Sequence, residues 1–239
     1  MIIFLHKRSN FFIQDNYDNI AFVYDRLSRL IFGKAQVVAQ TSLLAYIKKG
    51  DRLLIAGGGT GWILDEITKI HPSGLEIDYI ETSAKMLSKS KKRQFGLNKI
   101  TFTQKNVEDT DLNQIYDVIM TGFFFDNFEI RKAEQIFIYL DSLLNSGGLW
   151  LFTDFKPHFG KGYIWQTVML KIMYIFFRAV CKIEATHLVN MSPIFKDARY
   201  KPIFELTGYG NFIHSITYEK NSSFISIAKK EPIIPQKTF

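Results

Sequence analysis

The sequence predicts an α/β protein in which a mostly parallel sheet is covered by helices and ends in an antiparallel hairpin. Short apolar runs alternate with segments of helical periodicity from residue 52 onward, as expected for parallel strands joined by crossover helices. A cluster of glycines separates the first run from the helix that follows it. Two short strand-like segments follow each other near the C-terminus with a turn between them, which favours a hairpin.

Two helices are expected before the sheet. Residues 16–32 carry apolar side chains at helical spacing, at Ile20, Val23, Leu27 and Leu30, and Gly33 follows as a stop signal. Residues 35–48 predict a second helix. Residues 1–48 are therefore expected to form an N-terminal helical cap.

The core is expected over residues 49–154. Its strands are residues 52–56, 75–81, 99–104, 116–121 and 148–154, and its helices are residues 62–70, 83–95 and 130–144. The fifth strand follows the turn Asn145-Ser146-Gly147. A hairpin of residues 212–218 and 224–228, joined by a turn at 219–222, completes a seven-stranded sheet. One domain is expected over residues 1–239, with the closing hairpin at 211–230 and a frayed tail at 231–239.

Residues 155–210 are expected to form a helical insertion that caps a substrate. On a helix its polar side chains form one narrow stripe at Thr167, Lys171, Tyr174, Arg178 and Lys182, while most other positions are apolar. Such a helix must be covered on most sides. It is either an apolar substrate lid, able to rest on a membrane surface with Lys and Arg at the headgroups, or a buried cap helix or homodimer contact.

The composition indicates a globular protein with a core, since 47% of the residues are hydrophobic and 22% are charged. A formal net charge of +7 favours acidic partners such as nucleic acid, anionic lipid or an anionic small molecule. The single cysteine, Cys181, excludes an internal disulfide and a cysteine-based zinc site, and no metal site is predicted. Apolar residues precede basic ones at the N-terminus, the reverse of a secretory signal, so a cytoplasmic location is expected.

The glycine loop after the first strand reads Ala56-Gly57-Gly58-Gly59-Thr60-Gly61-Trp62. Glycines here let the backbone turn tightly and approach a ligand, and the following helix N-terminus presents free N–H groups. The dinucleotide fingerprint G-x-G-x-x-G fails, because Trp62 or Leu64 stands in its last position. The Walker pattern fails as well, since no Gly-Lys-Ser/Thr closes the loop. The remaining G-x-G-x-G pattern suits nucleoside and amino-acid parts, and a purely structural turn is the alternative.

Polar residues follow the next two strands. Glu81 ends the second strand, 20 residues after Gly61, where an acid in doubly wound folds accepts hydrogen bonds from both ribose hydroxyls. An ordinary exposed glutamate is the alternative. After the third strand, Asn106 offers a polar side chain to an adenine amino group, and Val107 offers its N–H to the ring. A nucleoside site is therefore predicted at the ends of the first three strands.

Taken together, these segments resemble the class I S-adenosyl-L-methionine (SAM)-dependent methyltransferases, which have a Rossmann-like fold. The segments that carry the resemblance are LLIAGGGTG (53–61), YIETSAKML (79–87), NVED (106–109), YDVIMT (116–121) and SGGL (146–149). The resemblance covers residues 16–229 and implies SAM as cofactor, with S-adenosyl-L-homocysteine (SAH) as its product. The cofactor contacts it implies are Gly57, Gly58, Gly59, Gly61, Glu81, Thr82, Met86, Asn106, Val107 and Thr121.

Two positions depart from the family pattern. Ile55 stands where an acid is usual, and Asn106 stands where aspartate is usual, although its amide oxygen can still accept a hydrogen bond. The flanks, residues 17–25 and 154–157, are similar to the C-methyltransferases of ubiquinone and menaquinone biosynthesis. In such enzymes the N-terminal helix lies over the cofactor, so Tyr17 and Tyr24, seven residues apart on one helix face, are implied as contacts; two core tyrosines are the alternative.

The reaction implied by the resemblance is in-line attack on the sulfonium methyl, for which the protein mainly aligns the acceptor and excludes water. No universal catalytic residue is implied, and Asp126, His158 and His187 are candidate bases by type only. The expected acceptor is a small, apolar or ring-containing molecule. An RNA or other nucleic-acid methyltransferase is the weaker alternative, because residues 121–126 lack the proline motif of the amino-group DNA enzymes. A non-catalytic SAM-fold binding protein is the third alternative, given Ile55 and Asn106.

Overall fold

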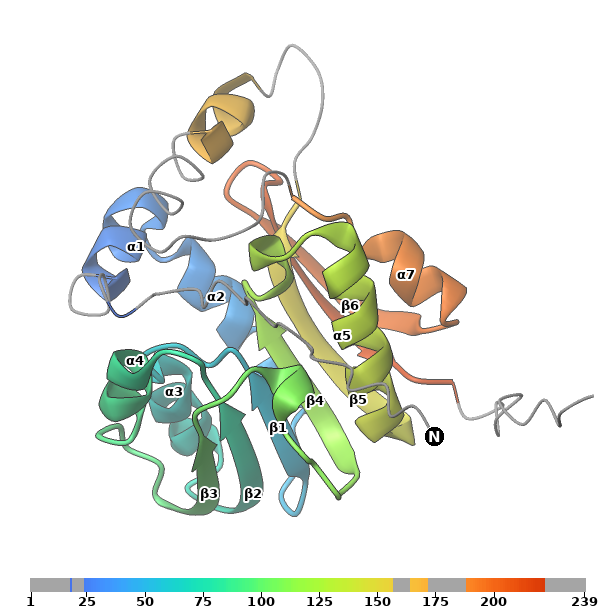
Figure 1. Cartoon of the computed structure of the whole chain (residues 1–239). Coiled ribbons are helices and arrows are strands. Elements are labelled where there is room, and N and C mark those ends of the chain that lie inside the picture. Colours follow the sequence, from blue (N-terminus) through green and yellow to red (C-terminus); the bar gives the residue numbers. More distant parts are fainter. Residues whose placement is uncertain (1–17, 19–23, 157–163, 172–187, 222–239) are drawn as a thin grey trace, which may run out of the picture.

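A seven-stranded mixed sheet forms the centre of the molecule (Figure 1). The computed structural model describes residues 18, 24–156, 164–171 and 188–221. The strand order is β3-β2-β1-β4-β5-β7-β6. Strands β1 to β5 are parallel, and β7 runs antiparallel to both β5 and β6. This arrangement confirms the predicted class of a mostly parallel sheet with a C-terminal antiparallel hairpin.

Helices and strands alternate along the first two thirds of the chain. The strands are β1 (Arg52–Ala56), β2 (Ser73–Ile80), β3 (Leu97–Thr103), β4 (Tyr116–Gly122), β5 (Leu144–Phe155), β6 (Lys201–Gly208) and β7 (Ile213–Glu219). The α-helices are α1 (Tyr24–Phe32), α2 (Ala35–Thr41), α3 (Trp62–Ile70), α4 (Ala84–Ser90), α5 (Ile130–Leu143) and α7 (Ser192–Asp197). Short 3₁₀ turns are η2 (Leu44–Tyr46), η3 (Val107–Asp109) and η4 (Phe125–Asn127). A further helical segment covers residues 164–171.

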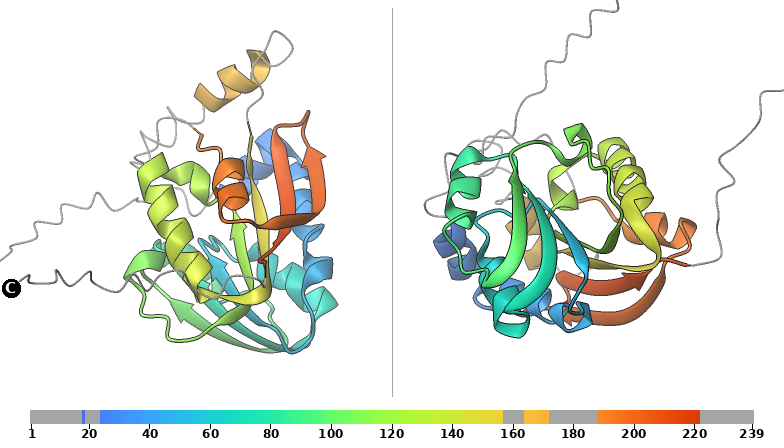
Figure 2. Two further views of the ribbon diagram at one scale, coloured as in Figure 1. Left: turned by 90° about the vertical axis from the view of Figure 1, so that its right-hand side faces the viewer. Right: turned by 90° about the horizontal axis from the view of Figure 1, so that it is seen from below.

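Helices cover both faces of the sheet and bury them. One cluster joins the sheet to α5 and α7 around Phe137, Trp150 and Phe195. The other joins the opposite face to α3 and η2 around Leu44 and Leu64. Figure 2 shows these two helical layers on either side of the strands. Burial on both faces explains why β1 and β4 are nearly continuous apolar runs rather than alternating ones.

The antiparallel hairpin lies one strand earlier in the chain than the sequence predicts. β6 pairs with β7 from Lys201 opposite Glu219 to Gly208 opposite Ile213, and the connection is the turn at residues 209–212. The predicted partner strand, residues 224–228, lies outside the described residues. β6 escapes sequence analysis because it is an edge strand with mostly exposed side chains and an early proline, Pro202, so it lacks an apolar run.

Within the described residues, three other predicted elements differ in their bounds by more than two residues. The helix expected at 35–48 stops at Thr41, where the hydroxyls of Thr41 and Ser42 bond back to main-chain carbonyls and compete with further helix. The helix expected at 83–95 is α4 and ends at Ser90. The turn expected at 145–147 belongs to an irregular start of β5, in which Gly147 has φ +76° and donates its N–H to the Lys220 carbonyl at 2.9 Å.

The helical segment 164–171 is fixed to the turn between β6 and β7. Gln166 is fully buried, and its Nε2 donates to the Gly210 carbonyl oxygen at 2.8 Å. The Trp165 ring meets Tyr209 edge-on, with ring centroids 5.6 Å apart. The segment is therefore held by a specific polar bond as well as by aromatic packing.

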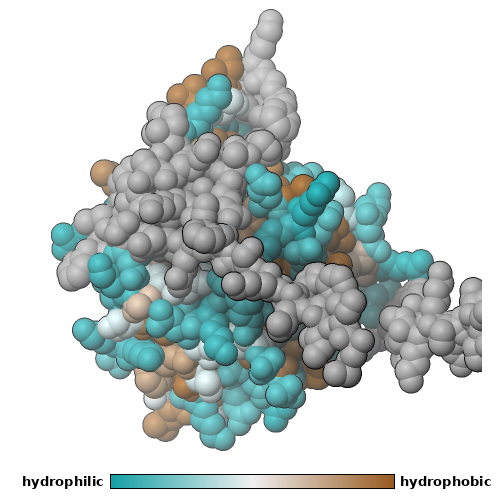
Figure 3. All heavy atoms as spheres, viewed as in Figure 1, coloured by the Kyte–Doolittle hydropathy of each residue, from teal (hydrophilic) through white to brown (hydrophobic). Residues whose placement is uncertain are grey.

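The outer side of this segment is apolar and exposed. Ile164 and Val168 are 63% and 50% exposed, and Figure 3 shows the apolar surface at this end of the molecule. Most of the predicted polar stripe, at residues 174, 178 and 182, lies outside the described residues. Within the ranges that the structure describes, no helix is long and apolar enough to cross a membrane.

Candidate functional site

A cavity opens at the carboxyl ends of the central parallel strands, beneath α1 and α2. β1 lies between β2 and β4 in the sheet, so the chain leaves the ends of these strands in opposite directions and forms a crevice there. Eight residues expected from the sequence line the cavity: Gly57, Gly58, Gly59, Glu81, Thr82, Met86, Asn106 and Val107. The structure therefore brings together the ends of the first three strands around one space.

The glycines of the loop meet different local requirements. Gly57 and Gly59 have φ of +67° and +63°, in the left-handed region that favours glycine. A Cβ on Gly58 would lie 2.1 Å from Cζ of Tyr79, so the loop packs directly on that ring. A Cβ on Gly59 would meet nothing within 4 Å. The loop is thus packed tightly from beneath and faces open space at Gly59.

Gly61 has a structural role at the start of α3 and does not line the cavity. Its φ is +76°, and a Cβ there would lie 2.5 Å from Cβ of Ser90 in α4. Only glycine allows α3 and α4 to approach this closely. Gly61 therefore serves the packing of α3 on α4, and the implied cofactor contact there stays a prediction.

Glu81 ties the end of β2 to the glycine loop. Its Oε2 accepts the Gly59 N–H at 2.8 Å, and its Oε1 accepts the Ser83 N–H at 2.8 Å. The residue is 6% exposed, so the alternative of an ordinary exposed glutamate is wrong. Burial raises the pKa of Glu81, and the backbone hydrogen bonds from Ser83 and Gly59 oppose that rise. Oε1 also accepts the Thr82 hydroxyl at 3.3 Å, so Oε2 is the oxygen that keeps a lone pair for a further hydrogen bond.

The end of β3 supplies a polar and an apolar group. The Nδ2 of Asn106 donates to the Asp109 carboxylate at 2.7 Å, which fixes the orientation of the Asn106 amide. Val107 is 4% exposed, and Met86 of α4, which also lines the cavity, is 3% exposed. Lys105 lines the cavity too, although the sequence offered no signal for it.

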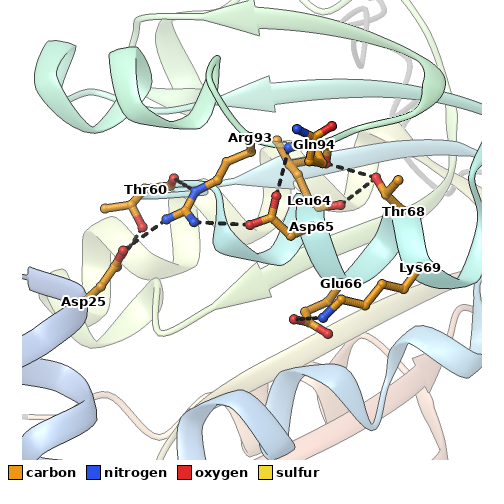
Figure 4. A network of polar contacts seen from close by, with 9 residues as sticks. All are labelled: Asp25, Thr60, Leu64, Asp65, Glu66, Thr68, Lys69, Arg93 and Gln94. Atoms are coloured by element: carbon orange, nitrogen blue, oxygen red, sulfur yellow. Dashed lines mark hydrogen bonds and ion pairs between the residues drawn. The ribbon is translucent and has the colours of Figure 1, made fainter.

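The N-terminal helix α1 is attached to the glycine loop through Asp25 (Figure 4). The Asp25 carboxylate accepts the Thr60 hydroxyl at 2.7 Å and the Arg93 guanidinium at 3.1 Å. Arg93 also donates to the Thr60 carbonyl at 3.0 Å and to Asp65 at 3.1 Å. One arginine therefore joins α1, the loop and α3.

A second aspartate of the N-terminal segment contacts the opposite rim. Asp18 accepts the Ser83 hydroxyl at 2.5 Å and the Lys85 N–H at 3.0 Å, at the start of α4. These hydrogen bonds lower the pKa of Asp18. Tyr17 lies outside the described residues, and Tyr24 is the first residue of α1. Asp18 and Asp25, their neighbours in the sequence, are the residues seen to hold the segment near the cavity.

Thr121 does not line the cavity, in contrast to the implied contact. Side chains alternate along β4, and Thr121 is buried with its hydroxyl accepting the Trp150 Nε1–H at 2.9 Å. Its neighbours Met120 and Gly122 line the cavity instead. The lining of the cavity at β4 therefore comes from the residues on either side of Thr121, and the cofactor contact at Thr121 stays a prediction.

An aromatic wall follows β4 and was missed in the sequence. Phe123, Phe124 and Phe128 line the cavity, with the last two rings edge-to-face at 5.0 Å. Three consecutive phenylalanines, at 123–125, were the sequence signal for this wall. In the sequence this segment served only to show that the proline motif of the amino-group DNA enzymes is absent. The other wall, formed by Arg29, Gln36 and Gln40 of α1 and α2, gave no sequence signal.

Two carboxyl groups, Asp126 of η4 and Asp154 of β5, lie behind the aromatic wall. Asp154 is buried and accepts the N–H groups of Phe125 and Phe155 at 3.1 and 2.8 Å. Asp126 accepts the side-chain amide of Asn127 at 2.8 Å. Burial raises the pKa of Asp126 to about 7 and raises that of Asp154 as well, with a contribution from the Asp126 charge. The pair therefore keeps a proton at pH values at which isolated aspartates are ionised.

The remaining candidate bases, His158 and His187, lie outside the described residues. Among the residues that the structure does describe, no group of three His, Cys, Asp or Glu side chains could hold a metal ion. Asp126 does not itself line the cavity.

No protein-family model and no curated protein sequence matches the chain. Solved structures do match it. An O-methyltransferase family protein from Burkholderia thailandensis is 17% identical with a TM-score of 0.57, over 87% of this chain and 59% of that protein. This chain thus spans about three fifths of that protein's length.

Two further structures contain SAH. Magnesium protoporphyrin IX methyltransferase from Synechocystis PCC 6803 is 17% identical with a TM-score of 0.61, over 87% of this chain and 98% of that one. The 1,6-didemethyltoxoflavin-N1-methyltransferase of Burkholderia thailandensis is 11% identical with a TM-score of 0.60, over 85% of this chain and 86% of that one. At these identities the likeness shows a shared Rossmann-like fold.

Proposed function

We propose that this chain is a SAM-dependent methyltransferase that acts on a small, ring-containing acceptor. One observation carries the proposal: Glu81 and the glycine loop line the same cavity and are hydrogen-bonded to each other. The Gly59 N–H donates to Oε2 of Glu81, with 2.8 Å between the nitrogen and the oxygen. A carboxylate at this place can accept from ribose hydroxyls, while Gly59 leaves open space for the ligand backbone.

The residues present fit an adenosyl amino acid. Glu81 would hold the ribose, Asn106 and Val107 would hold the adenine, and the loop of Gly57–Gly59 would lie against the amino-acid part. Ile55, 3% exposed and lining the cavity, gives an apolar contact where the family has an acid. When bound, SAM supplies a methyl group already activated by its cationic sulfur. The task of the protein is then to orient the acceptor and exclude water.

The structural neighbours support this proposal. Three of them were solved with SAH, and the names of the matching proteins include O-, N- and carbon methyltransferases. Several named acceptors are small ring molecules, including a magnesium porphyrin, a toxoflavin precursor and mitomycin.

The finer assignments stay predictions. Similarity to the quinone-biosynthesis subgroup depends on residues 17–25 and 154–157, most of which lie outside the described residues. Contact with a membrane surface, or pairing of two copies, would use the exposed apolar side of residues 164–171. A cytoplasmic location and the domain limits at 48, 154 and 210 are likewise expectations.

Methyl transfer from labelled SAM tests the proposal. Purified protein is incubated with SAM carrying a tritiated methyl group and, separately, with a solvent extract of cells or with total RNA. We expect label in the small-molecule fraction, lost in Glu81→Gln. Label only in RNA would reverse the choice of acceptor, and no transfer to either fraction would count against an enzyme.

A further inference from the structure

The cavity wall beside β4 carries a side-chain amide that is open to the cavity. Gln40 of α2 is 8% exposed and lines the cavity, and its side chain has no hydrogen-bond partner within the described part of the chain. A Cβ on Gly122 would lie 2.5 Å from Oε1 of Gln40, so the amide lies against the end of β4. Because Gln40 lines the cavity, its amide is open to water or to a ligand as a hydrogen-bond partner.

A positive charge lies on the same wall. Arg29 of α1 lines the cavity, and no described carboxylate pairs with it. It lies one helical turn after Asp25, so both side chains project from the same face of α1. Asp25 is neutralised by Arg93, whereas Arg29 is left to attract an anion.

Aromatic rings form the facing wall. Phe123, Phe124 and Phe128 follow β4, and Phe123 is held from behind by Phe155 at 4.7 Å between ring centroids. Flat aromatic surfaces favour planar ligands through stacked or edge-to-face contacts. The residues expected to hold the nucleoside come from β2 and β3, on the other side of β1 in the sheet. The β4 side is therefore free for a second ligand.

We propose that Gln40, Arg29 and the three phenylalanines form the acceptor subsite, and that the acceptor is a planar ring compound with a negatively charged substituent. Arg29 attracts the anionic group, Gln40 hydrogen-bonds to a polar atom of the ring system, and the phenylalanines hold its faces. This inference rests on the proposed function, because it assigns the part of the cavity that the cofactor leaves open.

Binding of two planar probes to the SAH-loaded protein tests the subsite. The probes are 2-naphthoate, which carries a carboxylate, and 2-naphthol, which is neutral at pH 7. We expect 2-naphthoate to bind about tenfold more tightly than 2-naphthol, on the scale of a hydrogen bond to a charged group. Arg29→Gln should remove this preference. Arg26→Gln is the matched control, since Arg26 is exposed on the same helix and does not line the cavity.

Two substitutions at Gln40 separate binding from folding. Gln40→Leu should weaken both probes by about five- to tenfold, the scale of one lost hydrogen bond. Gln40→Glu keeps the size but adds a negative charge, and should abolish 2-naphthoate binding while 2-naphthol still binds. SAH affinity should change less than about twofold in each variant, because Gln40 lies outside the part of the cavity that is assigned to the cofactor.

The outcomes distinguish the two proposals. If SAH binds and neither probe binds, the acceptor subsite is wrong and the proposed function stands. If Arg29→Gln weakens SAH and leaves 2-naphthoate unchanged, Arg29 holds the cofactor's carboxylate instead, which also overturns the inference. If SAH itself does not bind, the failure is that of the proposed function.

Discussion

Glu81 shows how a single side chain can connect two elements of a binding site. Its two oxygens accept N–H groups from Gly59 and Ser83, so the carboxylate joins the glycine loop to the segment that leads from β2 into α4. These bonds also offset the cost of burying the charge, which alone would raise its pKa. In the proposed function the same carboxylate accepts the ribose hydroxyls.

Replacing Glu81 by glutamine should weaken SAH binding by about 1–3 kcal/mol, because the charged acceptor is lost while the size is kept. Titration calorimetry with SAH measures the change. Glu76→Gln is the matched control on the same strand, since Glu76 is exposed and pairs with Lys99 and Arg52 at the surface. Equal SAH affinity in the wild type and Glu81→Gln would remove Glu81 from the site.

The Asp126 and Asp154 pair makes stability depend on pH. The folded state binds a proton at Asp126 more tightly than the unfolded state, because burial raises this pKa from 3.8 to about 7. The unfolded state therefore releases its proton first as pH rises, and the free energy of unfolding falls between these two values. The stabilising contribution is fully present at low pH and is lost as pH rises through 7.

Thermal unfolding from pH 5 to pH 8 should show this loss. We expect Asp126→Asn to flatten the fall of the melting temperature with pH, because the carboxyl with the raised pKa is gone. Asp111→Asn, an exposed aspartate, serves as control. A slope in Asp126→Asn that matches the wild type would show that the pair does not govern the pH response.

At the scale of elements, α1 acts as a wall of the cavity that is held by different contacts at its two ends. Its last residue, Phe32, is buried against Phe155 and Tyr209, while at its first turn the contacts of Asp25 with Thr60 and Arg93 attach it to the loop. Arg93 and Asp25 are 28% and 27% exposed, so their ion pair is partly shielded from solvent. A bond of this kind is stronger than a fully exposed one.

Asp25→Asn should lower SAH affinity by about three- to tenfold, since one charge-assisted contact that holds α1 over the cavity is weakened. Calorimetry with SAH gives the affinity, and amide hydrogen exchange in residues 25–32 should rise. Glu66→Gln breaks the Lys69 ion pair, whose lysine is 66% exposed, and should change neither. Unchanged exchange and affinity in Asp25→Asn would show that α1 does not need this contact.

Sequence patterns were sufficient to predict strands that are buried on both faces, and insufficient for a strand that is largely exposed. β1 and β4 were predicted almost to the residue because both of their faces are buried. β6 was missed because an edge strand shows no such run. Around the cavity, the motif of the glycine loop and its spacing to Glu81 were enough to predict these residues. Gln40 and Arg29 could not, because only the tertiary path of α1 and α2 brings them to β4.

At the scale of the whole molecule, the sheet order determines where a ligand can bind. β1 occupies the switch point between β2 and β4, and the cavity opens there. Residues from β2 and β3 line one side, and the aromatic wall and α2 line the other. Two ligands can therefore meet above the glycine loop, which is the arrangement that a transfer between them requires.

The most direct test of this account is a calorimetric titration of the intact protein with SAH, alongside a matched titration with NAD. The account predicts saturable one-to-one binding of SAH and no heat from NAD, because the loop lacks the dinucleotide fingerprint. No heat from SAH at about millimolar concentration, where even a weak site would fill, would contradict it.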